Sequence, residues 1–237
     1  MSEMKAVILA GGLGTRLRPY TLFVPKPLLP LGDRPLLEHI LLSLKKYDIN
    51  EVVITVSYLS KLIENYFGSG EDLNMKIEYV RSDRPMGTGG QLRTAEGRLE
   101  GAFLLLYGDQ FIDTNLAKFV EYHKVKGGLA TMLLMPYRQT LKYGFIDSDD
   151  TGRLVNWREK PAVEGWINAG CYVMEKKFLE YIPAGTMYGM DEAFREAMKR
   201  GEPIFTFKAE GDFVDIGDKE GYLSAHEKYL QRIGRIK

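Results

Sequence analysis

Glycines and cations follow the first apolar run of the chain. Residues 10–30 read AGGLGTRLRPYTLFVPKPLLP and hold three glycines, two arginines, one lysine and four prolines. A glycine turn lets backbone N–H groups approach phosphate oxygens closely, and Arg16 and Lys26 can neutralise phosphate charge. Pro25 and Pro27 fix the backbone on both sides of Lys26, so we expect an extended loop that presents this lysine stiffly. The stretch therefore predicts a cradle for a polyanion such as a triphosphate.

Two common glycine loops do not match this stretch. A dinucleotide-binding loop needs a third glycine three residues after the second, and Leu17 occupies that place when Gly12 and Gly14 are counted. No Gly-Lys-Ser/Thr sequence follows, so the stretch is not a Walker A loop either. An NAD-linked oxidoreductase is therefore disfavoured. A tight structural turn beside a solvated Lys26 remains the alternative to phosphate binding.

Two aspartates stand where a sheet would present them to a ligand. Asp109 ends the apolar run AFLLLYGD, and Asp215 lies in FVDIG between apolar residues and a glycine. Open α/β sheets bind ligands beyond the carboxyl ends of their strands, so Asp109 is well placed to hold a metal ion. Asp113 is a weaker candidate, because it suits the N-cap of a helix that begins at TNLAKF. The three histidines lie in no metal-binding or catalytic-triad pattern.

Strands and helices that could position these residues alternate along the first half of the chain. Periodicity predicts strands at 4–10, 51–57, 74–80 and 102–109 and helices at 35–49, 59–68 and 87–99. Such βαβ units imply a doubly wound, mainly parallel sheet with helices on both faces. In the second half we expect strands at 129–136, 143–149, 153–160 and 167–174, and helices at 175–181, 190–200 and from 219 to the end. No linker or repeat divides the chain, so residues 1–237 should form one α/β domain.

Composition excludes several classes of protein. The chain has 32 Lys and Arg, 32 Asp and Glu, and no basic block for a nucleic acid or a membrane surface. Its one cysteine, Cys171, rules out an internal disulfide framework and falls in an apolar run that predicts burial. No apolar run reaches the roughly 18 residues of a membrane span, and the first residues lack the layout of a signal peptide. We therefore expect a cytoplasmic protein without nucleic-acid or membrane partners.

Seven short blocks resemble, in order, the signature of the sugar-1-phosphate nucleotidyltransferases, also called nucleotide-sugar pyrophosphorylases. After GGLGTRLRPYT with PKPLLPL come PMGTGGQL at 85–92, YGD at 107–109, YGFI at 143–146, REKP at 158–161, INAGCYV at 167–173 and FVDIG at 213–217. The resemblance covers the catalytic domain, without the C-terminal left-handed β-helix common in the family. It implies a Rossmann-like fold and an enzyme that joins a nucleoside monophosphate to a sugar 1-phosphate and releases pyrophosphate.

The resemblance also implies a role for each matching residue. Asp109 and Asp215 would hold Mg²⁺, and the catalytic set would comprise Arg16, Lys26, Asp109 and Lys160. The nucleotide would contact Leu9, Ala10, Gly11, Gly12, Gly14, Thr15, Arg16, Lys26, Gly87, Thr88 and Gly89. The sugar phosphate would contact Tyr143, Gly144, Glu159, Lys160 and Asn168. The reaction needs alignment and charge neutralisation rather than a general base, because the attacking phosphate oxygen is already ionised.

The sequence narrows the identity of the nucleotide base and of the sugar less sharply than it does the reaction. The MGTGGQL block favours GTP, because guanylyltransferases for mannose 1-phosphate and manno-heptose 1-phosphate carry a similar block. UTP, dTTP or CTP with another sugar 1-phosphate, such as glucose or N-acetylmuramate, is the alternative. A catalytically weak nucleotide-sugar sensor is a further one, although the intact set of charged residues disfavours it. We also consider a homodimer, in which residues 185–203 would lie near the sugar pocket or between subunits.

Overall fold

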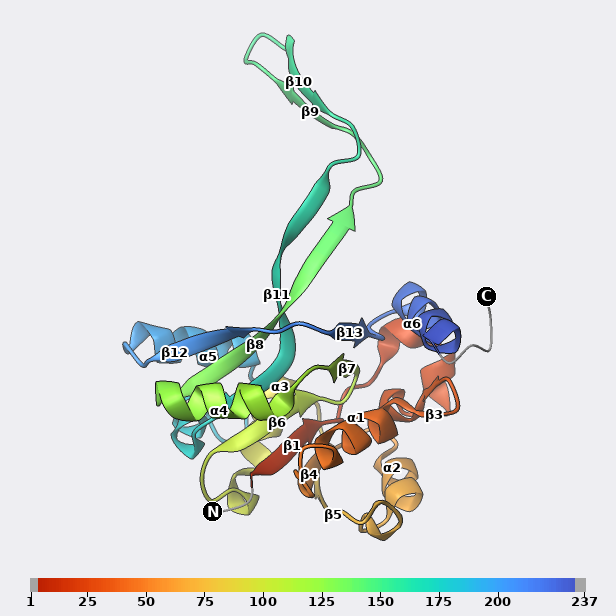
Figure 1. The fold of residues 1–237 in the computed structure, drawn as a ribbon, viewed down its shortest axis with the longest axis vertical. Helices are drawn as coiled ribbons and strands as arrows, with labels where there is room; N and C mark the ends of the chain where they lie inside the picture. Colours follow the sequence, from red (N-terminus) through yellow and green to blue (C-terminus); the bar gives the residue numbers. More distant parts are fainter. Residues whose placement is uncertain (1–3, 233–237) are drawn as a thin grey trace.

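The computed structural model describes residues 4–232, which fold around one central sheet (Figure 1). The sheet has seven strands in the order β12-β8-β11-β6-β1-β4-β5. Their bounds are β1 Lys5–Leu9, β4 Glu51–Val56, β5 Lys76–Arg81, β6 Phe103–Tyr107, β8 Ala130–Thr140, β11 Ala162–Met174 and β12 Ile204–Lys208. All neighbours pair in parallel except β11, which runs antiparallel to both β6 and β8. The expected mainly parallel sheet is confirmed.

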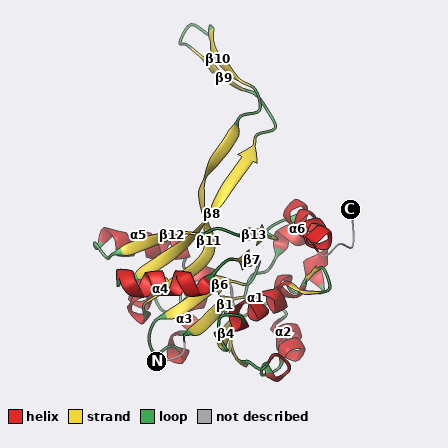
Figure 2. Ribbon diagram, in the orientation of Figure 1, coloured by secondary structure: helices red, strands yellow, loops and turns green. Residues whose placement is uncertain are grey.

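Helices cover both faces of this sheet (Figure 2). Their bounds are α1 Leu36–Lys45, α2 Ser60–Phe67, α3 Gly87–Thr94, α4 Leu116–Lys126, α5 Met190–Lys199 and α6 Lys219–Arg232. Ala6 and Ile8 of β1 belong to the core shared with α1, α2 and α4, whereas Val7 and Leu9 belong to the core shared with α3 and α5. Successive side chains of a strand point to opposite faces, so an unbroken apolar run is what a strand buried on both faces requires. The doubly wound arrangement is confirmed.

Three pairs of short strands complete the fold. They are β2 Pro30–Leu31 with β3 Arg34–Pro35, β7 Gln110–Asp113 with β13 Asp212–Asp215, and β9 Phe145–Ser148 with β10 Leu154–Arg158. The expected N-cap at Asp113 is wrong, because Asp113 ends β7. The cap of α4 is Asn115, whose Oδ1 accepts the N–H of Lys118 at 3.1 Å. Asn115 stands directly before the first helical residue, where a side-chain oxygen reaches the orphan N–H groups.

The glycine-rich stretch is not the extended loop that its prolines suggested. It forms three 3₁₀ turns, η1 Thr15–Leu17, η2 Tyr20–Leu22 and η3 Lys26–Leu28. The carbonyl of Pro25 accepts the N–H of Leu28 at 2.8 Å, which closes the turn that begins at Lys26. Proline lacks a donor but keeps its acceptor, so it fits directly before such a turn.

Some helices are also shorter or tighter than periodicity indicated. The predicted helix at 87–99 ends at Thr94 and is followed by the 3₁₀ turn η5 Glu96–Arg98, and 175–181 is the 3₁₀ helix η6 Lys176–Tyr181. Another 3₁₀ turn, η4, spans Glu71–Leu73. The helix expected from 219 onward is α6, and residues 233–237 lie outside the described part. Within residues 4–232, no helix has the length and apolar character that crossing a membrane requires.

A long hairpin leaves the body of the molecule. Strands β8 and β11 continue beyond the sheet and carry β9 and β10 at their far end (Figure 1). We call residues 137–166 the arm. The strands expected at 143–149 and 153–160 correspond to β9 and β10, and the one expected at 167–174 is the C-terminal half of the longer β11.

Candidate active site

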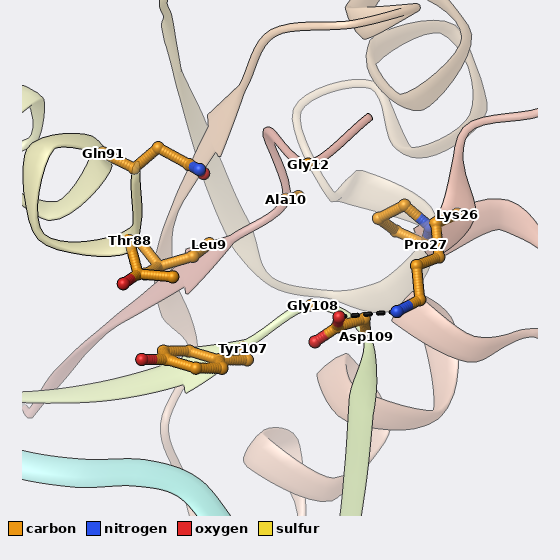
Figure 3. A pocket seen from close by; sticks show the side chains of 10 residues that line it. All are labelled: Leu9, Ala10, Gly12, Lys26, Pro27, Thr88, Gln91, Tyr107, Gly108 and Asp109. Carbon is orange, nitrogen blue, oxygen red and sulfur yellow. Dashed lines mark hydrogen bonds and ion pairs between the residues drawn. The ribbon is translucent and has the colours of Figure 1, made fainter. Parts of the chain in front are cut away.

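A cleft of about 100 Å³ opens at the carboxyl ends of β1 and β6 (Figure 3). Its floor is formed by the ends of these strands, one wall by α3 and the other by η3. The lining residues are Leu9, Ala10, Gly12, Lys26, Pro27, Thr88, Gln91, Tyr107, Gly108 and Asp109. Six of them, Leu9, Ala10, Gly12, Lys26, Thr88 and Asp109, were expected site residues, and the other four, Pro27, Gln91, Tyr107 and Gly108, lie in the quoted blocks. The cleft therefore lies where a doubly wound sheet binds its ligands.

The ammonium group of Lys26 forms an ion pair with Asp109 across this cleft. Nζ lies 2.6 Å from Oδ2 of Asp109, and Lys26 is only 7% exposed. Pro25 and Pro27, both buried, flank the lysine in η3. Asp109 follows β6 at a turn where the N–H of Gly108 donates to the carbonyl of Leu9 at 2.9 Å. The stiff presentation of a lysine to one fixed point is thus present, although a 3₁₀ turn provides it.

Asp215 is held beside Asp109 by the short ladder of β7 and β13. Asp215 pairs with Gln110, the residue after Asp109, and the N–H of Ile216 donates to the carbonyl of Asp109 at 3.3 Å. The Gln110 amide lies 3.5 Å from Oδ2 of Asp215. Within residues 4–232 no cluster of three or more His, Cys, Asp or Glu could hold a metal. The backbones of Asp109 and Asp215 are neighbours, and Mg²⁺ needs only one or two carboxylates together with phosphate oxygens and water.

Arg16 approaches the same place from the glycine-rich stretch. A side-chain carbon added to Gly217 would lie 3.1 Å from a carboxylate oxygen of Asp215 and 3.4 Å from Nη2 of Arg16. The exposed guanidinium and this carboxylate therefore border one small space. Gly14 begins η1 with a φ of 61°, a left-handed conformation that glycine adopts without strain, and its carbonyl accepts the Thr21 hydroxyl at 2.7 Å. The neighbouring Thr15 is exposed outside the cleft lining.

Two further cleft residues with polar side chains, Gln91 and Tyr107, were not among the expected site residues. Gln91 accepts the N–H of Gly11 at 3.0 Å through Oε1, so this N–H is engaged within the protein. Tyr107 lies on the floor of the cleft, and burial raises the pKa of its hydroxyl. Its oxygen lies 3.5 Å from that of Tyr172. Each stands two positions from an expected site residue, Gly89 or Asp109, and that spacing is the signal that could have identified them.

The glycines of the MGTGGQL block serve packing. Gly87 has a φ of 66°, and a side-chain carbon there would lie 2.5 Å from the carbonyl oxygen of Tyr188. Gly89 approaches the carbonyl of Gly189 in the same way, and the N–H of Met190 donates to Oγ1 of Thr88 at 3.0 Å. Residues 186–190 thus support the start of α3, which gives part of the 185–203 segment a definite structural role.

The residues expected to contact the sugar phosphate are divided between the body of the molecule and the arm. Asn168 lies in β11 near the cleft, where its amide donates to the Tyr172 hydroxyl at 2.6 Å and its oxygen accepts the N–H of Gly170 at 3.0 Å. The other four, Tyr143, Gly144, Glu159 and Lys160, lie on the arm and do not line the cleft. A single chain therefore places Lys26 and Asp109 in the cleft, with Asp215 and Arg16 bordering the strand beside Asp109, and leaves this second group on the arm.

The four arm residues gather where β9 and β10 meet β8 and β11. Trp157 donates its indole N–H to Glu159 at 3.0 Å, and both side chains lie against the backbone of Gly144. Lys160 has a φ of 42°, which is uncommon for a residue with a side chain and is typical of functional or strained sites. We call Tyr143, Gly144, Glu159 and Lys160 the elbow cluster.

The remaining titratable residues of interest are buried in the body. Cys171 is fully buried, as expected, and burial raises the pKa of its thiol. His123 is 2% exposed, and one ring nitrogen lies 2.8 Å from the Thr131 hydroxyl. Neither residue lines the cleft.

Known proteins of similar sequence are nucleotidyltransferases. The family model described as "Nucleotidyl transferase" matches residues 5–232. The chain is 34% identical over 248 residues to the UTP–glucose-1-phosphate uridylyltransferase of Synechocystis, covering 97% of this chain and 64% of that protein. It is 33% identical over 227 residues to the mannose-1-phosphate guanylyltransferase of Mycobacterium tuberculosis, covering 93% of this chain and 63% of that protein. The chain thus spans just under two thirds of the length of these two relatives.

Solved structures agree with this relationship. HddC from Yersinia pseudotuberculosis, solved in complex with GMP-PN, matches with a TM-score of 0.76 at 26% identity, covering 95% of this chain and 99% of that one. A putative glucose-1-phosphate thymidylyltransferase from Bacillus anthracis matches the fold with a TM-score of 0.79 at 24% identity, covering 95% of each chain. Because the family model matches nearly the whole described chain and the doubly wound sheet agrees with it, the chain belongs to the nucleotidyl transferase family.

Proposed function

We propose that this chain transfers a nucleoside monophosphate from a nucleoside triphosphate to a sugar 1-phosphate and releases pyrophosphate. The observation that carries the proposal is the buried Lys26 paired with Asp109 in the cleft, with Asp215 on the adjacent strand. A lysine that has lost most of its water is a strong partner for an incoming phosphate. Family membership supports the same reaction class.

The residues of the cleft match what this transfer requires. An ionised sugar-phosphate oxygen attacks the α-phosphorus, the bond to the β-phosphate oxygen breaks, and pyrophosphate leaves with the electron pair. The protein must align two anions and neutralise their charge. Lys26 and Arg16 supply fixed positive charge, and the backbone at Gly12, open to the cleft, allows the triphosphate to approach.

Mg²⁺ fits this arrangement. Asp109 and Asp215 would hold it, and when bound it would add positive charge beside the triphosphate. The ion pair with Lys26 keeps the Asp109 carboxylate aimed into the cleft in the structure without ligands. The lysine is then already within reach of whatever phosphate binds beside that carboxylate.

For the substrates we propose GTP with mannose 1-phosphate or a manno-heptose 1-phosphate, in the cytoplasm. The guanylyltransferase name of the Mycobacterium tuberculosis relative and the GMP-PN complex of the Yersinia protein support GTP. The uridylyltransferase name of the Synechocystis relative makes UTP with glucose 1-phosphate the first alternative. A dTTP or CTP reaction with another sugar 1-phosphate comes after it.

The test is pyrophosphate release with Mg²⁺ across GTP, UTP, dTTP, CTP and ATP against a panel of sugar 1-phosphates. We expect release with one nucleotide above the others, and the nucleotide-sugar product at the same rate. The Lys26→Gln variant should lose most of its activity with that pair, whereas the variant Lys199→Gln, at an exposed lysine that ends α5, should keep full activity. Absence of release from every pair, with a correctly folded chain, would contradict the proposal.

A further inference from the structure

The arm exposes an unusual amount of apolar surface. Of the twenty exposed large apolar side chains in residues 4–232, nine lie on its thirty residues. They are Tyr137, Tyr143, Phe145, Ile146, Leu154, Val155, Trp157, Val163 and Trp166. An isolated two-stranded ribbon is marginally stable in water, and contiguous apolar patches mark interaction sites. We therefore expect another protein surface to cover the apolar side chains of the arm.

One face of the arm tip carries most of this apolar character. Ile146 lies opposite Trp157 in the ladder of β9 and β10, and Leu154, opposite Ser148, is on the same face because the register shifts by one residue at Val155. The other face is mostly polar, since Asn156 and Arg158 both contact the Asp147 carboxylate, and its one large apolar residue, Phe145, has the Arg158 guanidinium over its ring. The tip is thus amphipathic, with one side suited to solvent and the other to a partner surface.

The arm does not reach its own cleft. From Asn168 opposite Leu134 to Ala162 opposite Thr140, the ladder of β8 and β11 runs without a break. Six residues at about 3.3 Å each place the elbow cluster roughly 20 Å beyond Asn168. Two interactions support this segment: an ion pair between Arg138 and Glu164, and a cation–π contact of Lys208 with the Trp166 ring. The elbow residues and the cleft are therefore two separated parts of the expected sugar-phosphate site.

A second apolar surface lies in the segment that joins two residues of the cleft, Gly12 and Lys26. Residues 13–24, which include η1 and η2, contain five more of the twenty exposed large apolar side chains: Leu13, Tyr20, Leu22, Phe23 and Val24. Phe23 is 78% exposed. The chain thus carries two apolar surfaces, one beside an incomplete cleft and one beside the residues that the cleft lacks. In a two-fold dimer, the first surface of each chain can pack against the second surface of the other chain.

We propose that two copies of this chain exchange arms, so that each elbow cluster completes the cleft of the other copy. The apolar face of one arm covers residues 13–24 of its partner, and Glu159 and Lys160 reach the sugar 1-phosphate bound there. This inference rests on the proposed function for the role of the elbow. The thirty residues of the arm match the roughly 20–30 residues per side of a stable interface. The same contact is made twice, which closes the assembly as a dimer.

Complementation between two inactive variants tests the exchange. Asp109→Asn disables the cleft and Lys160→Ala disables the elbow, so each variant alone should be inactive. The two chains are co-expressed with different affinity tags and purified on both, which isolates mixed dimers. An exchanged dimer then holds one site with both residues intact and should recover about half of the wild-type activity. Recovery no greater than that of either parent would overturn the proposal, because arms acting on their own clefts leave every site damaged.

Molecular mass in solution provides a readout that does not depend on catalysis. The wild-type chain should be a dimer, and Leu154→Asp on the apolar face of the arm should be a monomer. Val125→Asp is the matched control, since Val125 is 75% exposed on α4, and this variant should remain a dimer. A monomeric wild-type chain with full activity would overturn arm exchange. If the wild-type chain released no pyrophosphate with any pair of substrates, the proposed function would fail. The molecular masses of the wild-type chain and the two variants would still show whether the arm forms a dimer.

Discussion

Lys26 and Asp109 are 83 residues apart in the sequence, and their charged groups lie 2.6 Å apart in the cleft. Lys26 stands between two prolines in the 3₁₀ turn η3, and Asp109 stands in the turn after the buried strand β6. The Asp109 side chain is 37% exposed, whereas that of Lys26 is 8% exposed. This asymmetry leaves the carboxylate open to a further ligand while the lysine is fixed from behind.

Replacing Lys26 should impair catalysis far more than stability. Lys26→Gln should lower kcat/KM by about 100- to 1,000-fold, the usual loss when one charge-stabilising group is removed. The free energy of unfolding should change by less than about 1 kcal/mol, because the Asp109 carboxylate remains in contact with water. Steady-state kinetics and urea denaturation measure the two effects. Lys26→Arg should not restore activity, since a guanidinium does not fit this enclosed position, and a rescue would contradict the geometry.

Asp215 should matter for the metal requirement. Asp215→Asn should raise the Mg²⁺ concentration for half-maximal activity at least about tenfold, a loss seen even for residues that only support a metal ligand. Calorimetric titration with the nucleotide and Mg²⁺ should show a parallel loss of metal-dependent binding. Asp150→Asn, in the exposed turn at the tip of the arm, serves as the control and should leave both measurements unchanged. An unchanged metal requirement in Asp215→Asn would remove this carboxylate from the site.

Gly87 should tolerate no side chain. Gly87→Ala combines a left-handed backbone with a contact of 2.5 Å to the Tyr188 carbonyl, so it should lower the free energy of unfolding by about 2 kcal/mol or more. Gly97→Ala is the matched control, because nothing lies within 4 Å of its added carbon, and it should change stability by less than about 0.5 kcal/mol. Equal denaturation midpoints for the two variants would refute the packing role of this glycine.

His123 should make the protein less stable in mild acid. Burial lowers its pKa below 6.5, and the nearby Glu175 carboxylate opposes this only in part. Below about pH 6.5 the unfolded chain binds a proton that the folded chain still excludes, so the free energy of unfolding falls with pH until the folded pKa is passed. Burial also lowers the pKa of His39, so this residue adds to the loss of stability in acid. Urea denaturation at pH 7 and pH 5 should therefore show a smaller decrease for His123→Gln than for the wild-type chain. An identical decrease in the two proteins would exclude His123 as a source.

Much of the cleft could be predicted because its chemistry is local. A glycine turn after β1 and an acid after β6 are short patterns whose place at the sheet edge follows from the fold class. The form of residues 10–30 could not be predicted in the same way. Pro25 fixes its own φ angle, which is compatible with an extended loop and with a 3₁₀ turn. The turn forms because the Pro25 carbonyl accepts the N–H of Leu28, and this hydrogen bond is not visible in the sequence.

Long-range placement was less accessible from the sequence. Alternation along 143–160 predicts strands, yet it does not reveal that both faces of the ribbon lie outside the body. The glycines at 87 and 89 indicate close approach, and the structure shows that Tyr188 and Gly189 are what they approach. That contact joins segments about a hundred residues apart, so no window of sequence contains it.

The chain enters and leaves the arm at a single paired position, Pro136 opposite Trp166. Everything between these two residues is attached to the body by one antiparallel ladder, and the seven-stranded sheet is complete without it. A segment joined in this way can be transplanted between related enzymes as one cassette. Grafting residues 137–166 from a relative would alter the elbow and leave the cleft of Lys26 and Asp109 untouched, so the two halves of the substrate pair can evolve separately.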